Sequence, residues 1–344
     1  MVNEPEKTSG RYKEVASRVR EWLEIHKGEH FDLDLISRQL NLGTAEARKY
    51  AAIELSRKVQ QGILEKVSNR YIYIDSSYKV IDWLNASVES FDVKFPYGIE
   101  DQTKFGFDGS ALISPGDIIV IAGQSNAGKT LFCLNLLWEN MDNYPCTLMG
   151  NEYAPGKFKR RVFRMKWRSP VNVDGQPKFE LIERFNRWQD IIRPNNINII
   201  DWINITDNFY QIGGIIEAIK GKLERGIAVI SLQKSGENPH GRGGTFSVDM
   251  TSLYLSMDFN RLTVIKSKEW ERYNPNRKTY GFEIVNQGTQ FQNIRAIKKC
   301  YRCKGNGFNN QGKCDECGGT GWIDDPKDDS CEMITQEYKE AQDE

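Results

Sequence analysis

Residues 117–130 read DIIVIAGQSNAGKT, and this stretch decides the fold class of the chain. It begins as an apolar strand, turns through a glycine-rich segment and continues into the amphipathic helix KTLFCLNLLWENM. The turn fits the pattern G-x-x-x-x-G-K-[ST] in full, with the flanking strand and helix that a phosphate-binding loop requires. We therefore expect an ATP site within an α/β domain. The alternative is a glycine-rich turn that fits the pattern by chance.

The chemistry of this loop gives its residues separate roles. Glycines let the backbone curl so that its N–H groups point at phosphates, and the helix N-terminus adds a partial positive charge. Lys129 is expected to reach the β- and γ-phosphates, and Thr130 is expected to ligate Mg²⁺. The other residues expected to bind the nucleotide are Gly123, Gln124, Ser125, Asn126, Ala127 and Gly128.

Beyond the loop, strands and helices alternate from about residue 105 to residue 291, which predicts a domain with a mostly parallel sheet. Buried strands are expected where apolar and β-branched residues run together between turn residues. These stretches are DIIVIAG, PCTLMG, INIIDWI, GIAVISLQ, SLYLSMD, RLTVIKS and YGFEIVN.

The lead-in to the loop, GIEDQTKFGFDGSALISPGDIIVIAG, resembles the entry of RecA-like ATPases, most closely the branch of the DnaB helicase, RadA and KaiC. The resemblance covers residues 105–291 and implies a RecA-like core over residues 105–295. It also implies a catalytic glutamate at Glu152, after PCTLMG, and a Walker B aspartate at Asp201, in INIIDWI. A glutamine that senses the γ-phosphate is implied at Gln233, the end of GIAVISLQ.

Each implied residue has a chemical rationale and an ordinary alternative. Asp201 at the end of a buried strand can hold Mg²⁺ through its water shell, or it only caps the strand. Glu152 can orient and deprotonate the attacking water, or it is an acid in a surface loop. Gln233 can hydrogen-bond the γ-phosphate and report its loss to the following loop, with the same ordinary alternative.

In the resembling branch, a lysine and an arginine from a neighbouring subunit complete the site. Here Lys266, Lys268 and Arg272 occupy the corresponding stretch. The branch has a K-x-R arrangement, whereas this chain has K-S-K with the arginine four residues further on. These residues act in trans within a homo-oligomer, a ring or a filament, or they are solvated charges.

Two segments of this domain suggest contact with nucleic acid. The stretch GENPHGRGG, residues 236–244, takes the place of a single-stranded-DNA loop in the resembling branch. Its glycines are expected to give mobility, and His240 and Arg242 could approach phosphates. The alternative is a surface loop without a ligand. The basic run KFKRRVFRMKWR, residues 157–168, is a solvated helix face or a phosphate-tracking surface. Helical spacing puts Phe163 and Trp167 toward the core.

The N-terminal 80 residues have the order of a winged helix: a helix, a helix–turn–helix and two short strands. Thr44 is expected to cap the third helix, which would enter the major groove of duplex DNA. A linker is expected over residues 81–104. Winged helices also dock proteins, so a protein partner is the alternative. The candidate DNA contacts are Arg48, Lys49, Arg57 and Lys58.

Two C-x-x-C pairs predict a zinc module over residues 296–323. Each pair leads into a glycine-rich turn, CKGNG or CGGTG, and these halves resemble the zinc domain of DnaJ chaperones, with ligands for one Zn²⁺. The alternative is a redox dithiol pair. The module surface could also touch nucleic acid or a protein partner. The expected ligands are Cys300, Cys303, Cys314 and Cys317.

Composition sets the remaining expectations. The chain has 47 basic and 47 acidic residues, so its global charge carries no argument for nucleic acid. Residues 324–344 are acidic and are expected to form a flexible tail. The polar N-terminus is unlike a signal peptide, and no stretch has the length of a membrane span, so we expect a cytoplasmic protein without a membrane partner.

Together these features predict a DNA-dependent ATPase of replication or recombination, similar to the DnaB helicase or a related motor. The compact size and the appended modules suggest a phage or mobile element as its source. Two other functions stay open: an ATP-switched DNA-binding adaptor that does not unwind DNA, and a KaiC-like regulatory ATPase without a role on DNA.

Overall fold

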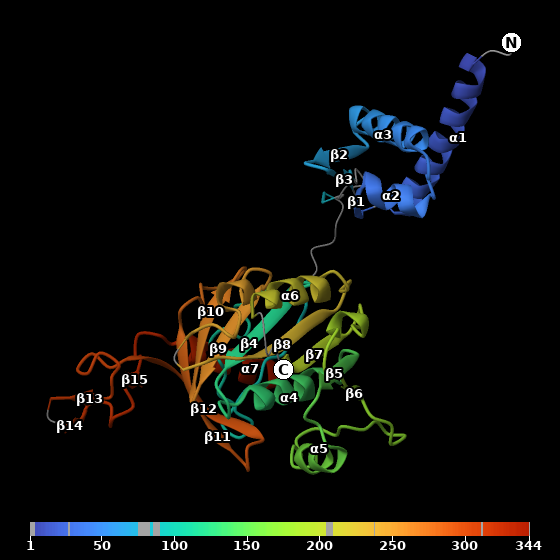
Figure 1. Ribbon diagram of the computed structural model, residues 1–344. Helices are drawn as coiled ribbons and strands as arrows, with labels where there is room; N and C mark the ends of the chain where they lie inside the picture. Colours follow the sequence, from blue (N-terminus) through green and yellow to red (C-terminus); the bar gives the residue numbers. More distant parts are fainter. Residues whose placement is uncertain are drawn as a thin grey trace. The chain divides into compact units, whose positions relative to one another are not determined.

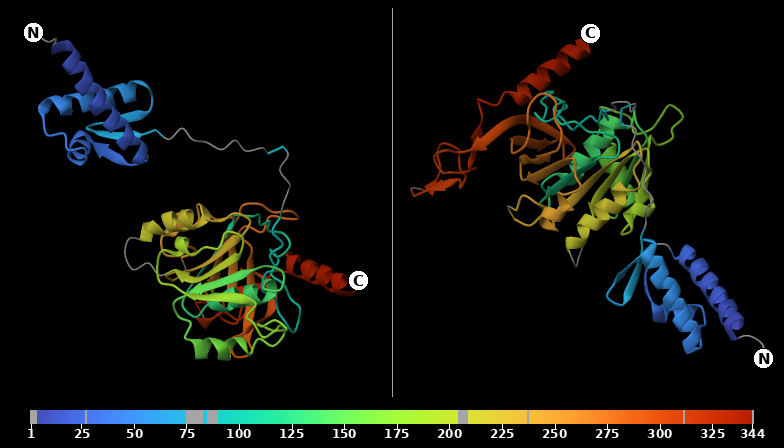
Figure 2. Two further views of the ribbon diagram at one scale, coloured as in Figure 1. Left: turned by 90° about the vertical axis from the view of Figure 1, so that its right-hand side faces the viewer. Right: turned by 90° about the horizontal axis from the view of Figure 1, so that it is seen from above.

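The computed structural model describes residues 4–26, 28–74, 83–84, 90–203, 209–236, 238–310 and 312–343. The chain divides into two compact units, residues 1–87 and residues 88–344, which are described separately (Figures 1 and 2). Among the described residues, no helix is long and apolar enough to cross a membrane.

The first unit packs three helices against a small antiparallel sheet (Figure 1). Its core includes Val19 and Trp22 of the first helix and Leu55 of the third, all buried. The sheet order is β1-β3-β2. The elements are α1 (Glu4–Ile25), β1 (His30–Asp32), α2 (Leu33–Gln39), α3 (Ala45–Gln60), β2 (Leu64–Val67) and β3 (Arg70–Tyr73).

Capping residues set where two of these helices begin. The Thr44 hydroxyl accepts a hydrogen bond from the Ala47 N–H at 3.1 Å, which confirms the predicted cap of α3. Asp32 caps α2, and the residues before it pair with β3. Phe31 is buried against Trp22 and Tyr71, and this packing draws its backbone into the sheet.

The second unit contains a ten-stranded mixed sheet in the order β15-β12-β11-β10-β9-β4-β8-β7-β5-β6. The six strands from β9 to β6 are parallel, and the others pair antiparallel. The parallel strands are β4 (Ile118–Gly123), β5 (Cys146–Gly150), β6 (Phe179–Glu183), β7 (Ile197–Ile203), β8 (Ile227–Gln233) and β9 (Leu253–Asp258). The antiparallel part comprises β10 (Arg261–Ser267), β11 (Thr279–Val285), β12 (Gln290–Lys299) and β15 (Trp322–Asp324).

Helices cover both faces of the parallel strands (Figure 1). Alternate residues of β4 separate the two cores: Ile119 and Ile121 face the cluster that contains α4 (Lys129–Asn140). Ile118 and Val120 face the cluster that contains α6 (Ile212–Lys220). Because β4 is buried on both faces, it is an almost continuous apolar run. The short helices are α5 (Pro155–Val162), η1 (Trp188–Asp190), η2 (Phe209–Gln211) and η3 (Gly244–Ser247).

All seven predicted strands are present, and the ten-stranded sheet has three further strands that were not predicted, β6, β12 and β15. Strand β6 (FELIE) lies at the edge of the sheet and is half exposed, so it lacks the apolar run that marks a buried strand. Strand β12 mixes polar and apolar residues over ten positions and extends past residue 295, where we expected the core to end.

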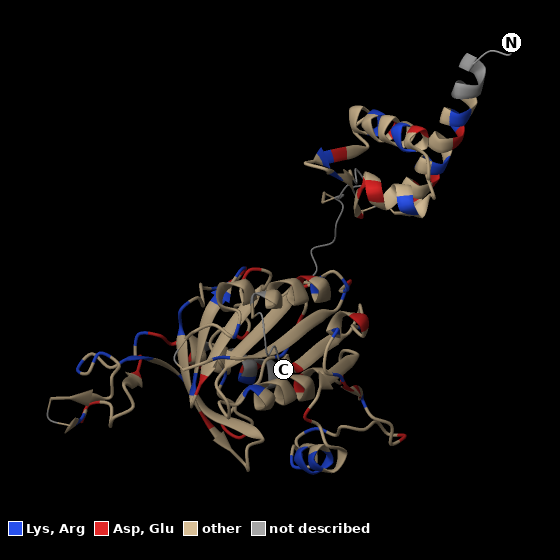
Figure 3. Cartoon of the chain, viewed as in Figure 1, with Lys and Arg blue, Asp and Glu red and all other residues tan. Residues whose placement is uncertain are grey.

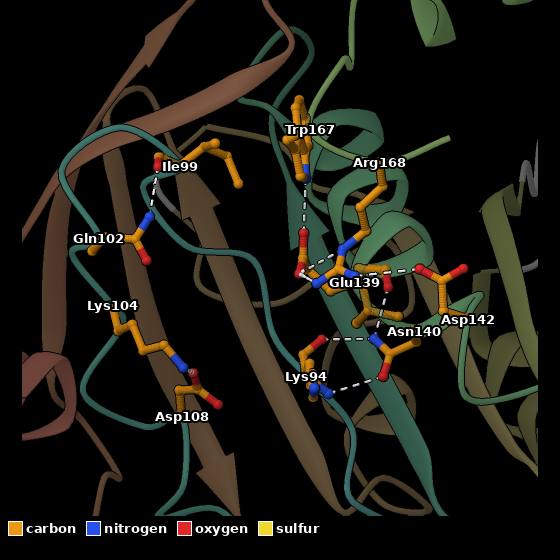
Figure 4. A network of polar contacts seen from close by, with 11 residues as sticks. Lys94, Ile99, Gln102, Lys104, Asp108, Glu139, Asn140, Asp142, Trp167 and Arg168 are labelled. Carbon is orange, nitrogen blue, oxygen red and sulfur yellow. Dashed lines mark hydrogen bonds and ion pairs between the residues drawn. The ribbon is translucent and has the colours of Figure 1, made fainter. Parts of the chain in front are cut away.

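A polar network joins α4 to the segments around it (Figure 4). Asn140 exchanges hydrogen bonds with the backbone of Lys94 at 2.7 and 2.9 Å, and Phe95 is buried nearby. The predicted linker, residues 81–104, is therefore too long, because its last part belongs to the second unit. The buried carboxylate of Glu139 accepts hydrogen bonds from the side chains of Trp167 and Arg168 at 2.9 and 3.0 Å.

Two features follow β12. The cysteine-rich segment, residues 300–321, projects from the sheet edge between β12 and β15 and includes the hairpin of β13 (Phe308–Asn309) and β14 (Gly312–Lys313) (Figures 1 and 2). The expected flexible tail instead forms α7 (Ser330–Asp343). Cys331 and Ile334 are buried against the rest of the second unit, and this apolar contact offsets the acidic composition of the tail.

Candidate nucleotide site and cysteine cluster

A cavity of about 620 Å³ lies where β4, β7 and β8 end. It is lined by the phosphate-loop residues Ser125, Asn126, Gly128, Lys129 and Thr130, and by Glu152, Asp201 and Gln233. The parallel register explains this convergence, since Gly123 pairs with Gln233 and Gly150 with Asp201 across neighbouring strands. Carboxyl ends of parallel strands meet at one edge, which is where ligands bind in such sheets.

Two glycines of the loop have backbone geometry or surroundings that exclude a larger residue. Gly128, at the start of α4, has φ 103°, and a Cβ there would lie 3.1 Å from Ile284 Cδ1. A Cβ on Gly123 would lie 2.8 Å from Lys129 Cγ. The loop is therefore shaped for close approach of a ligand to its backbone, as a phosphate requires.

The Lys129 ammonium occupies the centre of this loop. It donates hydrogen bonds to the carbonyls of Gly123 and Gln124 at 3.0 and 2.8 Å and to Gln233 Oε1 at 3.2 Å. Burial lowers the pKa of Lys129, whereas the nearby Asp201 and Glu152 oppose this shift. The predicted lysine and the predicted sensor glutamine, 104 positions apart, are thus in direct contact.

Asp201 is buried and held by two hydroxyl groups. Its Oδ2 accepts a hydrogen bond from Tyr153 at 2.6 Å, and its Oδ1 accepts one from Ser231 at 3.0 Å. Burial and the Asp201 carboxylate raise the pKa of Tyr153, so the phenol stays a donor. The next residue, Trp202, has φ 79°, a strained conformation that costs about 1–3 kcal/mol and is found most often at functional sites.

Not every expected nucleotide ligand reaches the cavity. Gly123, Gln124 and Ala127 shape the loop from behind without lining the space. The Gln124 side chain donates to Asp258 Oδ1 at 3.1 Å and to the Gly236 carbonyl at 2.9 Å. It therefore ties the phosphate loop to two neighbouring segments. Glu152 lies exposed after β5 and faces the cavity from the loop before α5.

Apart from Leu131, which directly follows the phosphate loop, sequence reasoning missed four residues that line the cavity, and it placed one more elsewhere. Arg242 was expected on a DNA-binding loop, but it lines this cavity. The missed residues share no motif, because their elements are brought to the cavity only by the fold. They are Arg161 of α5, Trp202 after Asp201, Ile284 of β11 and Gly288 of the following turn.

The three residues expected to act in trans lie away from the cavity of their own chain. Lys266 donates hydrogen bonds to the carbonyls of Val248 and Asp249 at 2.9 and 3.1 Å. Lys268 is exposed, and Arg272 lines a different cavity beside Lys104 and Asp108. His240 also lies outside the cavity that Lys129 lines, with its ring 6.1 Å from that of Tyr254.

The basic run forms α5 and the turn after it, and α5 carries positive charge along its length (Figure 3). The expectation that Phe163 faces the core is wrong. The helix ends at Val162, so the helical spacing does not continue, and Phe163 is 56 % exposed beside the Lys159 ammonium. Trp167 packs against the core as expected.

The four candidate DNA contacts on α3 do not share one face. Lys49 and Arg57 line an open groove on α3 together with Ile53, which is 44 % exposed. Arg48 points to another side and forms an ion pair with Asp34. Lys58 is half buried. Lys49 and Arg57 are therefore the pair that a nucleic-acid backbone could meet together.

The four cysteines of the C-x-x-C pairs form a compact cluster. Their sulfur atoms all lie within 4.8 Å of one another. Cys300 Sγ is 3.9 Å from Cys314 Sγ, and Cys303 Sγ is 3.7 Å from Cys317 Sγ. Tetrahedral coordination with Zn–S bonds of about 2.3 Å requires a sulfur separation of about 3.8 Å, so the cluster fits one Zn²⁺ ion.

The two halves of the cluster repeat the same backbone contact. The Gly307 N–H donates to Cys303 Sγ at 3.3 Å, and the Gly321 N–H donates to Cys317 Sγ at 3.2 Å. A Cβ on either glycine would approach a carbonyl oxygen within 2.4 Å, so only glycine fits. Backbone donors to sulfur stabilise thiolates, which is the form that binds a metal.

In comparisons with known proteins, no family model and no curated protein matches this chain.

Proposed function

We propose that this protein binds and hydrolyses ATP with a RecA-like core of the DnaB, RadA and KaiC branch, and that it acts on DNA. One observation carries the proposal: Lys129 of the phosphate loop contacts Gln233 inside a cavity that also contains Asp201 and Glu152. A chance glycine-rich turn would give no reason for these three side chains to meet there.

The donor set also fits the metal that ATP hydrolysis requires. Thr130 and Asp201 would hold Mg²⁺, which neutralises phosphate charge when bound. Tyr153 and Ser231 fix the Asp201 carboxylate in one orientation. Glu152 is exposed to solvent within the cavity and would accept a proton from the attacking water.

The appended modules support a role on DNA. In the first unit, Lys49 and Arg57 on the open face of α3 would meet the phosphates of a duplex if this helix enters the major groove as the third helix of a winged helix does. The cysteine cluster would hold a structural Zn²⁺, since four thiolates close its coordination sphere.

A second candidate, the ATP-switched adaptor, is favoured by the link between Gln233 and the loop after it. The Arg242 N–H donates to the Gln233 carbonyl at 2.8 Å, so a change at the phosphate reaches this loop directly. Strand displacement distinguishes the two functions, because only a helicase separates a duplex.

The test of ATP hydrolysis is Lys129→Ala, measured as ATP turnover of the purified chain with and without single-stranded DNA. Turnover should be abolished, because the substitution removes the cation that faces the β- and γ-phosphates. The control is Lys222→Ala, which removes an exposed lysine after α6. If Lys129→Ala keeps wild-type turnover, the cavity is not the ATP site. DNA-stimulated turnover of the wild type separates the proposal from a KaiC-like ATPase.

A further inference from the structure

We infer that the nucleotide cavity takes its arginines from its own chain: Arg242 and Arg161 act in cis on the γ-phosphate. This inference rests on the proposed ATP hydrolysis and adds two residues to it. Of the residues expected to act in trans, Lys266 is already held by two backbone carbonyls of its own chain. Arg161 and Arg242 line the same cavity as Lys129.

The backbone at Arg242 is held in place by close packing of the two glycines that flank it. A Cβ on Gly241 would lie 2.8 Å from Leu232 Cβ, and a Cβ on Gly243 would lie 2.2 Å from Ile212 Cγ2. The backbone therefore packs directly against β8 on one side of Arg242 and against α6 on the other. Gly243 also has φ 102°, which favours glycine. These glycines serve close packing, whereas we had expected them to give mobility.

Hydrogen bonds fix the same stretch of backbone. The Gly241 N–H donates to the Tyr254 hydroxyl at 2.8 Å, and this hydroxyl also contacts Ser247 Oγ at 2.8 Å. The Arg242 N–H donates to the Gln233 carbonyl at 2.8 Å, next to the Lys129 contact. These contacts fix the backbone that carries the exposed Arg242 side chain, so the guanidinium starts from a defined position at the cavity. A positioned charge of this kind is the basis of electrostatic stabilisation.

Neither guanidinium is neutralised by a carboxylate in the parts of the chain that the structure describes. The Arg242 guanidinium lies 5.7 Å from the ring centre of Phe209 and forms no ion pair with a described residue. Arg161, half buried on α5, makes no side-chain hydrogen bond or ion pair to a described residue. By contrast, Arg168, Arg193 and Arg261 are each paired with a carboxylate. A guanidinium left free in a cavity is available to an anion.

The chemistry assigns these arginines to the phosphate that is transferred. The water oxygen bonds to the γ-phosphorus while the bond from this phosphorus to the β–γ bridging oxygen breaks. One water proton passes to the Glu152 carboxylate, and the electron pair of the broken bond leaves on ADP. Arg161 and Arg242 neutralise the negative charge of the γ-phosphoryl oxygens and of the leaving oxygen during this step.

The first test is ATP turnover of full-length Arg242→Ala and Arg161→Ala in the absence of DNA. Each substitution should lower kcat by about 10²-fold and change KM little, because the charge acts mainly in the transition state. Arg242→Lys should recover part of the lost rate. The matched control is Arg160→Ala, since Arg160 is the exposed neighbour of Arg161 on α5 and does not line the cavity.

The second test distinguishes cis from trans action by complementation. Lys129→Ala chains and Arg242→Ala chains are co-expressed and purified together. If the arginine acts in cis, no complex contains an intact site and turnover stays at the sum of the two variants. Recovery of turnover in the mixture would show action in trans and would overturn the inference.

The outcomes separate this inference from the proposed function. If wild-type protein neither binds nor hydrolyses ATP, the proposed function fails. If wild-type protein hydrolyses ATP, Lys129→Ala abolishes turnover and both arginine variants keep the wild-type kcat, then only the inference fails. Thermal unfolding of each variant checks that a lower rate of ATP turnover is not caused by unfolding of the protein.

Discussion

The cysteine cluster and the nucleotide cavity belong to the same unit, yet they are assembled in opposite ways. The four thiols come from one short stretch, residues 300–317, and the ligand set is complete within it. The cavity collects side chains from Ser125 to Gly288, from at least five separate elements. A local site such as the cysteine cluster follows from the spacing of residues in the sequence. A dispersed site such as the cavity exists only after the strands of the sheet have assembled.

This difference predicts how each site responds to damage. Loss of a cysteine should remove the metal and disturb only the segment around it, because the small segment has almost no apolar core of its own. Loss of a residue in the cavity should change ATP chemistry and leave the metal in place. Three predictions test this independence, from the largest expected effect to the smallest.

The largest effect is expected for the double substitution of Cys314 and Cys317 by serine. Metal content should fall from about one ion per chain to none, because two of the four ligands are lost. The segment should then become sensitive to proteases after Lys298, while ATP affinity stays at the wild-type value. Elemental analysis, limited proteolysis and a nucleotide-binding titration measure these three results.

The control for this prediction replaces Asp315 and Glu316 by serine, in the same turn and with exposed side chains. It removes a surface ion pair between Arg302 and Asp315 and a hydrogen bond between Glu316 and the exposed Tyr301, and should keep the metal. If the double cysteine variant also loses ATP binding, the two sites are coupled and the comparison is wrong.

A middle effect is expected for Gly128→Ala in the phosphate loop. Alanine at φ 103° is strained, and its Cβ would crowd Ile284, so the loop should shift away from its phosphate-binding shape. A cost of about 2 kcal/mol would weaken ATP binding by about thirtyfold. Calorimetric titration with ATP measures this change, and metal content should not change.

Gly156→Ala is the matched control, because a Cβ on Gly156 meets nothing within 4 Å and its φ is not in the left-handed region. This variant should bind ATP as the wild type does. If both variants lose ATP affinity to the same extent, the affinity of the loop for ATP does not depend on the left-handed backbone conformation of Gly128.

The smallest effect is expected for Tyr153→Phe, which removes one of the two hydrogen bonds to Asp201. The ring packs on Gly150, where a Cβ would lie 2.6 Å from Tyr153 Cε2, so the hydroxyl is held in place. Without it, the Mg²⁺ concentration for half-maximal ATP turnover should rise by about tenfold. If the Mg²⁺ concentration for half-maximal turnover is unchanged, Asp201 is not part of the metal site. Tyr301→Phe, an exposed tyrosine near the cysteine cluster, is the control.

The same distinction between local and dispersed features decides which parts of the molecule could be predicted from the sequence. The strand–loop–helix around Lys129 and the cysteine cluster could be predicted, because the residues that form each of them are close together in the sequence. Asp201 and Gln233 were found only through resemblance to a family. Arg161 could not be found, because its place in the cavity depends on how α5 packs after β5.

Two errors have a local cause. Phe163 was expected inside because a helical spacing was extended past Val162, where α5 ends. The glycines around Arg242 were interpreted as a sign of mobility, because sequence alone does not show what a Cβ would meet. The structure shows that Leu232 and Ile212 occupy that space.

The pairing of β15 with β12 has a consequence for solubility. Strand β15 is short, and it covers the open edge of β12 only at Ile297, Lys298 and Lys299. The cysteine cluster connects the two strands, so a metal bound there would hold β15 in position. When the cluster comes apart, this edge loses its cover and presents unpaired backbone groups, which is how sheet proteins associate with copies of themselves. Metal supply would then control aggregation of this chain even when the nucleotide cavity is intact.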